Sequence, residues 1–216
     1  MHNLRKHSKK PKVFCVGQGK TGTTSVEKAL KHLGYKMGNQ VKGERLLEAY
    51  VKRDFKAIVN FCKTAEAFQD APFGFHYTFI ALDQAFPQAK FILTHRDSDE
   101  QWYRSLTHFH KKLFGEGKRI PTWDDLNRAT YRYKGYVAEV RKKVYGIEES
   151  EDPYHETKLK AYYNAHNAMI LNYFKHKDNL LVLNVAEADA YKKMCTFLDK
   201  EPQYSSFPWE NKTSEL

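Results

Sequence analysis

Short apolar runs alternate with longer amphipathic segments along most of this chain. Residues 12–17 (KVFCVG) combine β-branched and aromatic residues and end at a glycine, which predicts a buried strand. Residues 89–95 (AKFILTH) and 180–185 (LLVLNV) have the same character, and residues 65–69 (AEAFQ) form a shorter candidate. The pattern therefore predicts four strands distributed along the whole chain.

Apolar positions at helical spacing fill the segments between these strands. Val26, Ala29 and Leu33 repeat on one helical face, so a helix is expected to follow the first strand. A further helix is expected to begin after Ser98, because Gln101 follows three residues later and completes a capping-box pattern. The remaining predicted helices cover residues 43–53, 54–64, 75–86, about 123–145, 156–176 and 187–198.

Strands that alternate with helices indicate a doubly wound α/β fold, with a mostly parallel sheet and helices on both faces. One domain is expected over residues 12–211. Within it, residues 116–154 are polar, charged and rich in tyrosine. This segment is expected to form a helical insertion that covers a cleft.

The charge of the chain is unevenly distributed. The 216 residues carry a net charge of +10, and residues 1–12 contain five basic residues and no acidic one. Half of the excess charge therefore lies in a short basic tail, and residues 1–11 are expected to be disordered. The remaining excess favours an enzyme whose ligand carries several negative charges.

The sequence argues against membrane-spanning, secreted and zinc-binding proteins. No apolar run approaches the roughly 20 residues of a membrane-spanning helix, and the N-terminus lacks the apolar region of a secretory signal. Cys15, Cys62 and Cys195 form no CxxC pair, so buried thiols are expected rather than a zinc site or a disulfide framework. The sequence predicts a soluble cytoplasmic protein without a metal site.

Residues 17–25 (GQGKTGTTS) lie between the first predicted strand and a predicted helix, a context typical of phosphate-binding loops. Glycines let the backbone N–H groups turn inward, and the start of a helix adds unpaired donors and the positive end of its dipole. Lys20 adds a full positive charge. The expected cradle for a phosphate or sulfate group consists of Gln18, Gly19, Lys20, Thr21, Gly22, Thr23, Thr24 and Ser25.

The loop departs from the GxxxxGK[ST] motif of nucleotide triphosphatases. Gly17 and Gly22 have the required spacing, but Thr23 stands in place of the lysine, and Lys20 lies inside the loop instead. Only Asp70 follows a predicted strand as a candidate magnesium ligand. A sulfuryl group carries less negative charge than a phosphoryl group, so lysine, hydroxyls and amides can suffice without a metal. A small-molecule kinase or nucleotidase that uses Mg·ATP stays the alternative.

These segments resemble the sulfotransferases that use 3'-phosphoadenosine-5'-phosphosulfate (PAPS) and release 3'-phosphoadenosine-5'-phosphate (PAP). Residues 20–25 resemble their 5'-phosphosulfate loop, and residues 91–97 followed by 102–105 resemble their 3'-phosphate segment. In that family a strand-end arginine and a serine in the next helix bind the 3'-phosphate. The resemblance implies these roles for Arg96 and Ser105.

The resemblance covers residues 12–211, and it implies a P-loop-type α/β fold. The C-terminal residues 197–198 and 207–211 are similar to one branch, the compact small-molecule sulfotransferases. Two features depart from the family. Arg96 and Ser105 are nine residues apart instead of eight, and the glycine-rich C-terminal loop is missing, so purine contacts are expected from elsewhere, near Lys212. A salt bridge from Arg96 to Asp97 or Asp99 is the competing interpretation.

Sulfuryl transfer needs a base that removes the proton of the attacking acceptor. Asp70 is the first candidate, because it closes the second predicted strand and Asp70-Ala71-Pro72 resembles the segment that carries the base in the compact branch. A turn or N-cap aspartate is the alternative. Lys20 is expected to stabilise the charge on the leaving oxygen. The other candidate bases are His76, His95, His108 and Glu44.

The acceptor is expected to be the hydroxyl or amine of a small molecule. Aromatic side chains can line an apolar pocket for it, although any single one of them can equally be a core residue. A nucleic-acid-binding module that uses the basic tail is the third hypothesis, but no known nucleic-acid motif supports it. The aromatic candidates are Phe73, Phe75, Tyr77, Tyr131, Tyr133, Tyr136, Tyr162 and Tyr163.

Overall fold

The computed structural model of this protein describes residues 11–207. Within these residues, four parallel strands form one sheet in the order β2-β1-β3-β4. All four predicted strands are present, and the predicted doubly wound α/β fold is confirmed. The strands are β1 (Val13–Cys15), β2 (Ala67–Phe68), β3 (Lys90–Thr94) and β4 (Leu180–Leu183).

Helices connect the strands and follow them in the described part of the chain. The first half contains α1 (Thr23–His32), α2 (Gln40–Glu44), α3 (Leu47–Val51), α4 (Phe55–Phe61), the 3₁₀ helix η1 (Cys62–Thr64) and α5 (Thr78–Ala85). The second half contains α6 (Asp99–Phe114), α7 (Trp123–Arg128), α8 (Tyr136–Lys143), α9 (Glu156–Phe174) and α10 (Ala190–Phe197).

Some predictions fall on residues outside the described part of the chain. These are the predicted basic tail up to residue 10 and the end of the predicted domain at 208–211. Lys212, near which purine contacts were expected, also lies there. Pro11, the last residue of the predicted tail, is described and is exposed.

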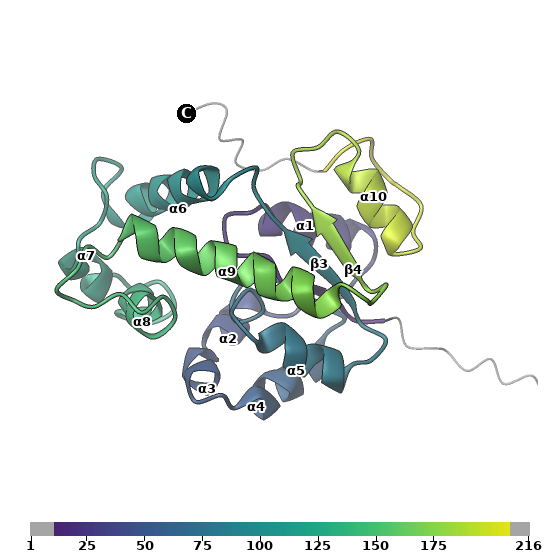
Figure 1. The fold of residues 1–216 in the computed structure, drawn as a ribbon, viewed down its shortest axis with the longest axis horizontal. Helices are drawn as coiled ribbons and strands as arrows, with labels where there is room; N and C mark the ends of the chain where they lie inside the picture. Colours follow the sequence, from purple (N-terminus) through teal and green to yellow (C-terminus); the bar gives the residue numbers. More distant parts are fainter. Residues whose placement is uncertain (1–10, 208–216) are drawn as a thin grey trace, which may run out of the picture.

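The side chains of β1 alternate between two hydrophobic layers, because successive residues of a strand point to opposite faces. Val13 and Cys15 pack in the layer formed with α1 and α10. Phe14 faces the other layer, where its ring stacks on Phe68 and Phe91 at centroid distances of 5.6 and 5.5 Å. Figure 1 shows α9 running across this second face of the sheet. Both faces of the sheet are therefore covered.

The three cysteines are buried and form no disulfide, as expected. Burial raises the pKa of the Cys15 and Cys62 thiols to about 12, so both stay protonated at neutral pH. Cys195 is buried in α10. The thiols act as small apolar core groups.

Two predicted helices in the first half differ from the observed elements. The predicted helix 43–53 is wrong as one unit, because Leu46 leaves helical geometry (φ −81°, ψ 12°) and separates α2 from α3. The predicted helix 75–86 begins later than expected. Tyr77 adopts the left-handed region (φ 66°) and α5 starts directly after it. In both cases a backbone turn interrupts an apolar pattern that continues in sequence.

The start of α6 agrees with its predicted cap only in part. The Ser98 hydroxyl accepts a hydrogen bond from the Gln101 amide at 3.1 Å, as a helix N-cap does. The return bond is shifted by one residue, because Gln101 Oε1 accepts from the Asp97 amide at 2.9 Å. The cap fixes where α6 leaves the end of β3.

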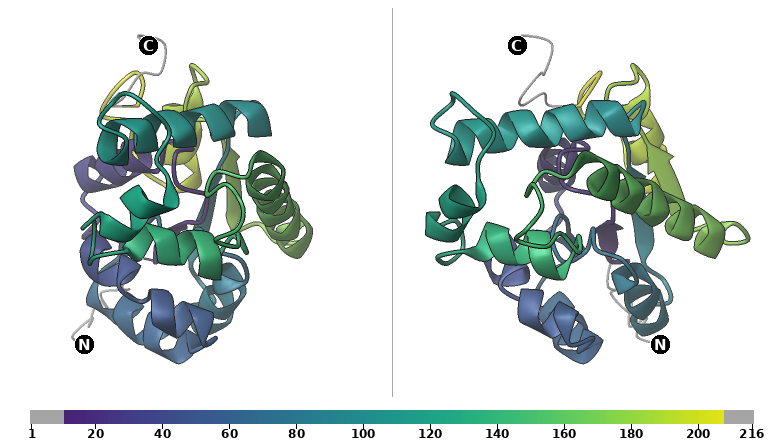
Figure 2. Two further views of the ribbon diagram at one scale, coloured as in Figure 1. Left: turned by 90° about the vertical axis from the view of Figure 1, so that its left-hand side faces the viewer. Right: turned by 60° about the vertical axis from the view of Figure 1, so that its left-hand side comes forward.

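The predicted insertion contains two helices instead of the single expected helix 123–145. After α7, Ala129 is extended, and Gly135 has a φ of 81° directly before α8. Figure 2 shows α7 and α8 beside the segment that carries α2 and α3. An ion pair between Arg132 and Glu44 joins the two segments.

The parallel register brings the carboxyl ends of the strands to one edge of the sheet. Phe14 pairs with Phe68, and Cys15 pairs with Ile92. The segments that follow β1, β2 and β3 therefore emerge side by side, where ligands of open α/β sheets bind. Residues 17–25, the predicted phosphate loop, leave β1 at this edge.

The loop after β1 packs against β3 with no room for a side chain at Gly17. A Cβ there would lie 2.1 Å from Thr94 Oγ1 and 2.4 Å from the Thr94 carbonyl oxygen. At Gly19 the nearest atom would be Asp70 Oδ1 at 3.4 Å, an ordinary contact distance.

We predict that Gly17→Ala lowers the free energy of unfolding by about 1–3 kcal/mol, because the added methyl group forces the backbones apart. Gly19→Ala serves as the matched control and should change it by less than about 0.5 kcal/mol. Urea denaturation of both variants measures the difference. Equal losses in the two variants would contradict this packing.

Candidate active site

The phosphate loop turns through two left-handed residues before α1 begins. Lys20 has a φ of 73° and Gly22 a φ of 100°. α1 then starts at Thr23, and no side chain caps its N-terminus. The first amides of a helix have no partner within the helix, so those at Thr23 and Thr24 are donors available to a ligand. This arrangement is a ready anion site.

Buried hydrogen bonds hold the loop from the protein side. The Thr21 hydroxyl lies 2.6 Å from both the Gln18 carbonyl oxygen and Thr94 Oγ1. Gln18 donates from its Nε2 to the Gly74 carbonyl oxygen, and both side chains are buried. The Trp102 indole donates to the Gly19 carbonyl oxygen at 2.9 Å. Gln18 and Thr21 thus shape the loop, whereas Thr24 is exposed at its outer side.

Arg96 lies directly beside this loop. Its Nε donates to the Lys20 carbonyl oxygen at 2.9 Å, and its amide donates to Tyr163 Oη at 2.9 Å. Its terminal Nη atoms have no hydrogen-bond or ion-pair partner among residues 11–207. The alternative salt bridges are not formed, because Asp97 pairs with Gln101 and Asn184, and Asp99 pairs with Asn164.

Ser105 is buried on α6, one turn after Trp102. Trp102 fixes this part of α6 against the loop through its bond to Gly19. No hydrogen bond within the described residues joins Ser105 to Arg96. The structure therefore places the two predicted 3'-phosphate ligands on neighbouring segments, without direct contact between them.

Asp70 follows β2 and faces the loop. It has a left-handed φ of 64°, and its carboxylate accepts from the Ala71 amide at 3.0 Å and from Gln40 Nε2 at 3.3 Å. Burial raises the pKa of this carboxyl to about 6, and the nearby Glu44 charge acts in the same direction. At neutral pH the carboxylate is therefore ionised and more basic than a surface aspartate.

Lys20 reaches the same space from the loop. Its ammonium lies 3.3 Å from the centroid of the Phe109 ring, a cation–π contact. Burial lowers the pKa of Lys20 to about 8; the Asp70 charge opposes this shift and the Arg96 charge adds to it. Lys20 and Asp70 are thus both charged near pH 7, and each charge favours the ionised form of the other group.

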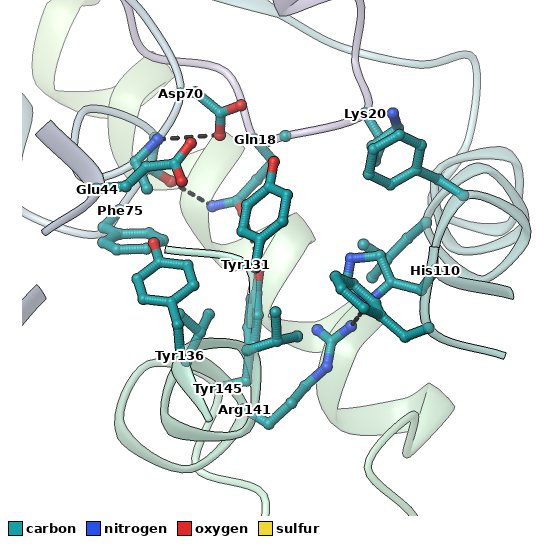
Figure 3. Close-up of a pocket in the computed structure, with 18 residues that line it drawn as sticks. Gln18, Lys20, Glu44, Asp70, Phe75, His110, Tyr131, Tyr136, Arg141 and Tyr145 are labelled. Carbon is teal, nitrogen blue, oxygen red and sulfur yellow. Dashed lines mark hydrogen bonds between the residues drawn. The ribbon is translucent and has the colours of Figure 1, made fainter. Parts of the chain in front are cut away.

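A cavity of about 120 Å³ joins these groups. Figure 3 shows Lys20 and Asp70 at one end of it, with Gln18 between them and aromatic rings below. Residues of the predicted insertion form much of its wall. The insertion contributes Tyr131, Tyr136, Val137, Val140, Arg141 and Tyr145.

Of the five candidate bases, only Asp70 and Glu44 line this cavity. Glu44 is engaged in a bidentate ion pair with Arg132. His76 stacks on Tyr162, with ring centroids 3.7 Å apart. This pairing gives the histidine a packing role.

The two remaining histidines also lie away from the cavity wall. His95 contacts the carbonyl oxygen of Arg96 through its Nδ1 at 3.0 Å. His108 lies on α6 with a buried Nε2 that has no partner in the described chain. Neither one lines the cavity that holds Lys20 and Asp70.

Three polar residues of the cavity wall were not among the sequence candidates: His110, Arg141 and Tyr145. A signal for Arg141 is visible in retrospect. It shares a helical face with Val137 and Val144, where an arginine in an apolar stripe is unusual. Tyr145 and His110 carry no comparable signal, because their neighbours in sequence are ordinary surface and core residues.

The comparison with known families adds one finding to this geometry. The model of the family described as "Sulfotransferase domain" matches residues 12–216. This chain belongs to the sulfotransferase family. The match spans nearly the whole chain and includes the phosphate loop, Asp70 and Arg96, so the sulfotransferase fold and sulfuryl transfer in general follow from it. No curated protein matches the chain.

None of the helices within residues 11–207 has the length and apolar character needed to cross a membrane. No group of three or more His, Cys, Asp or Glu side chains within those residues is arranged to hold a metal ion.

The loop hydroxyls are predicted to have separate roles. Thr21→Val should lower the free energy of unfolding by about 1–3 kcal/mol, because it removes a buried hydroxyl and leaves its partners unsatisfied. Thr24→Val should change it by less than about 0.5 kcal/mol, since that side chain is exposed. Chemical denaturation measures both. Similar losses would show that Thr21 does not anchor the loop.

Proposed function

We propose that this sulfotransferase moves the sulfuryl group of PAPS to a hydroxyl, or an amine, of a small acceptor molecule. The observation that carries the proposal is the meeting of Lys20 and Asp70 at one cavity. They come from the loops after β1 and β2, and the unpaired N-terminus of α1 lies beside them. An anion site, a cation and a base thus share one space.

The donor is proposed to lie along the carboxyl edge of the sheet. The amides at the start of α1, with the Thr23, Thr24 and Ser25 hydroxyls near them, suit its phosphosulfate group. The planar fork of Arg96 has its terminal N–H groups available and suits the 3'-phosphate. Ser105 is proposed as a second ligand of that phosphate, since α6 starts just after Arg96.

The acceptor is proposed to occupy the cavity with its reacting group toward Asp70. As the acceptor oxygen forms a bond to sulfur, its proton passes to the Asp70 carboxylate. The bond from sulfur to the phosphate oxygen of the nucleotide breaks, and Lys20 neutralises the charge that collects on that oxygen. Both residues act in a largely buried site, where such electrostatic effects are strong.

The insertion 116–154 is proposed to cover the bound acceptor. Its side chains form a wall of the cavity, and the Arg132–Glu44 ion pair ties it to the segment after α1. Excluding water there would protect the reaction and strengthen the interactions of Lys20 and Asp70. The apolar lining favours a compact acceptor with an apolar body.

Binding of PAP tests the donor site. PAP at millimolar concentration should raise the melting temperature, and Lys20→Ala and Arg96→Ala should each weaken its affinity about 10- to 100-fold, the loss of a charged hydrogen bond. Lys31→Ala, an exposed position on α1, is the control and should bind PAP normally. Stronger protection by Mg·ATP than by PAP would favour a kinase and overturn the proposal.

The dependence of kcat/KM on pH tests the catalytic pair, because it reports the pKa values of the free enzyme. Activity should rise as Asp70 loses its proton near pH 6 and fall as Lys20 loses its proton near pH 8. The expected profile is a bell with its maximum between these values.

Asp70→Asn should lower kcat about 10²- to 10⁴-fold and remove the rising limb. Asp54→Asn, an exposed N-cap of α4, is the control and should keep the wild-type profile. A rising limb that persists in Asp70→Asn would assign the base to another group.

A further inference from the structure

Arg141 is a buried charge without an ionic partner. Only 1% of its surface is exposed. Among residues 11–207 no carboxylate forms an ion pair with it. Its Nη2 donates to His110 Nδ1 at 3.1 Å, the Tyr154 hydroxyl is a second, uncharged hydrogen-bond partner, and its buried Nε has no partner among the described residues.

Buried arginines are almost always paired, because a lone charge away from water is strongly disfavoured. The rings of Tyr154 and Tyr145 lie 4.6 and 5.3 Å from the guanidinium carbon. Such cation–π contacts offset only part of the lost hydration. The donors left over at Arg141 indicate that an anion from outside the chain completes the site.

Arg132 of the same insertion provides an internal comparison. It is also largely buried, but Glu44 neutralises it through two hydrogen bonds. The insertion therefore pairs one of its buried arginines within the protein and leaves the other unpaired toward the cavity. General basicity of the segment does not explain this difference.

The charge at the Arg141 end of the cavity amounts to one unit. His110 is neutral, because burial lowers its pKa well below its ordinary value, and the charges of Arg141 and Lys20 act in the same direction. The His110 Nδ1 also lies 2.8 Å from the Tyr154 hydroxyl. One unpaired planar cation matches a single carboxylate, whereas a phosphate would bring a second negative charge without a partner.

Arg141 lies at the opposite end of the cavity from the proposed reaction centre. Figure 3 shows Lys20 and Asp70 at one end, Arg141 at the other, and His110 between Lys20 and Arg141. The cavity wall also contains apolar side chains, among them Leu106 and Val140. A molecule that spans the cavity would thus meet a base, an apolar middle and a cation.

We infer that the acceptor of this sulfotransferase is a hydroxylated carboxylic acid, whose carboxylate binds Arg141 while its hydroxyl lies at Asp70. This inference rests on the proposed function and narrows the class of its substrate. The carboxylate removes the unpaired charge of Arg141, and it orients the acceptor so that its far end reaches the base.

Matched pairs of binding probes test the inference without relying on turnover. The pairs are 4-hydroxybenzoate, 3-(4-hydroxyphenyl)propionate and 5-(4-hydroxyphenyl)pentanoate, each with its uncharged carboxamide, and calorimetry measures their affinities with and without PAP. At least one acid should bind about 10- to 100-fold more tightly than its amide, the range of a charge-assisted hydrogen bond. Acids that bind no better than their amides at all three lengths would overturn the inference.

Arg141→Met tests whether this residue causes the preference. The variant should bind the acid only as tightly as the wild type binds the amide, and its affinity for the amide should stay within about threefold of the wild-type value. Its melting temperature should be equal or higher, because a buried unpaired charge is removed. Arg128→Met, at an exposed arginine of α7, should retain the preference. A lower melting temperature with equal loss for acid and amide would show a structural role and contradict the inference.

The experiment separates the two proposals. Failure of PAP to bind counts against the proposed function, whereas the acid-to-amide ratio without PAP still measures the Arg141 site. Sulfation of the amides together with rejection of the acids would support sulfuryl transfer and exclude the carboxylate class.

Discussion

The close packing of the loop after β1 against the neighbouring strand ends is the constraint on which the rest of the site depends. Gly17 approaches Thr94 so closely that no side chain fits, and the Thr21 hydroxyl bridges back to the same threonine. These buried contacts provide hydrogen-bond partners for the polar groups on the inner side of the loop. The first amides of α1 have no partner within the helix. Packing within the protein thus shapes the loop that is proposed to bind the phosphosulfate group.

Parallel strands explain why the reactive groups gather at one edge. Each of β1, β2 and β3 delivers one polar residue to the same side of the sheet: Lys20, Asp70 and Arg96. Their charges are linked, since Asp70 supports the charge of Lys20 and Arg96 opposes it. Burial alone lowers the pKa of Lys20 and raises the pKa of Asp70, which favours the neutral form of each group. Each charge opposes the shift of the other, so both groups stay ionised near pH 7.

The predicted insertion, residues 116–154, brings two further arginines, Arg132 and Arg141, to this edge of the sheet. The turn between α7 and α8 places Arg132 against Glu44, and Asp70 is the carboxylate of the cavity wall without an ion-pair partner among residues 11–207. The other arginine, Arg141, stays without a counter-charge at the far end. In the proposed function the cavity has Lys20 and the proposed base Asp70 at one end and Arg141 at the other, an arrangement that suits an acceptor with matching ends.

The amino-acid sequence by itself determined the strands, most helices, the fold class and the glycine-containing turn at residues 17–25, because alternation, helical spacing and glycine chemistry are local properties. It also placed Lys20 in the loop after the first strand, and Asp70 and Arg96 at strand ends. Only the tertiary structure decided that α2 and α3 are separate helices and that Arg132 forms an ion pair with Glu44. It also decided that Arg141 has no carboxylate partner among the described residues. Such ion pairs join residues that are far apart in the chain, and the packing of the folded chain determines which charged side chains come within reach of each other. A single sequence records which charges exist but not which of them meet.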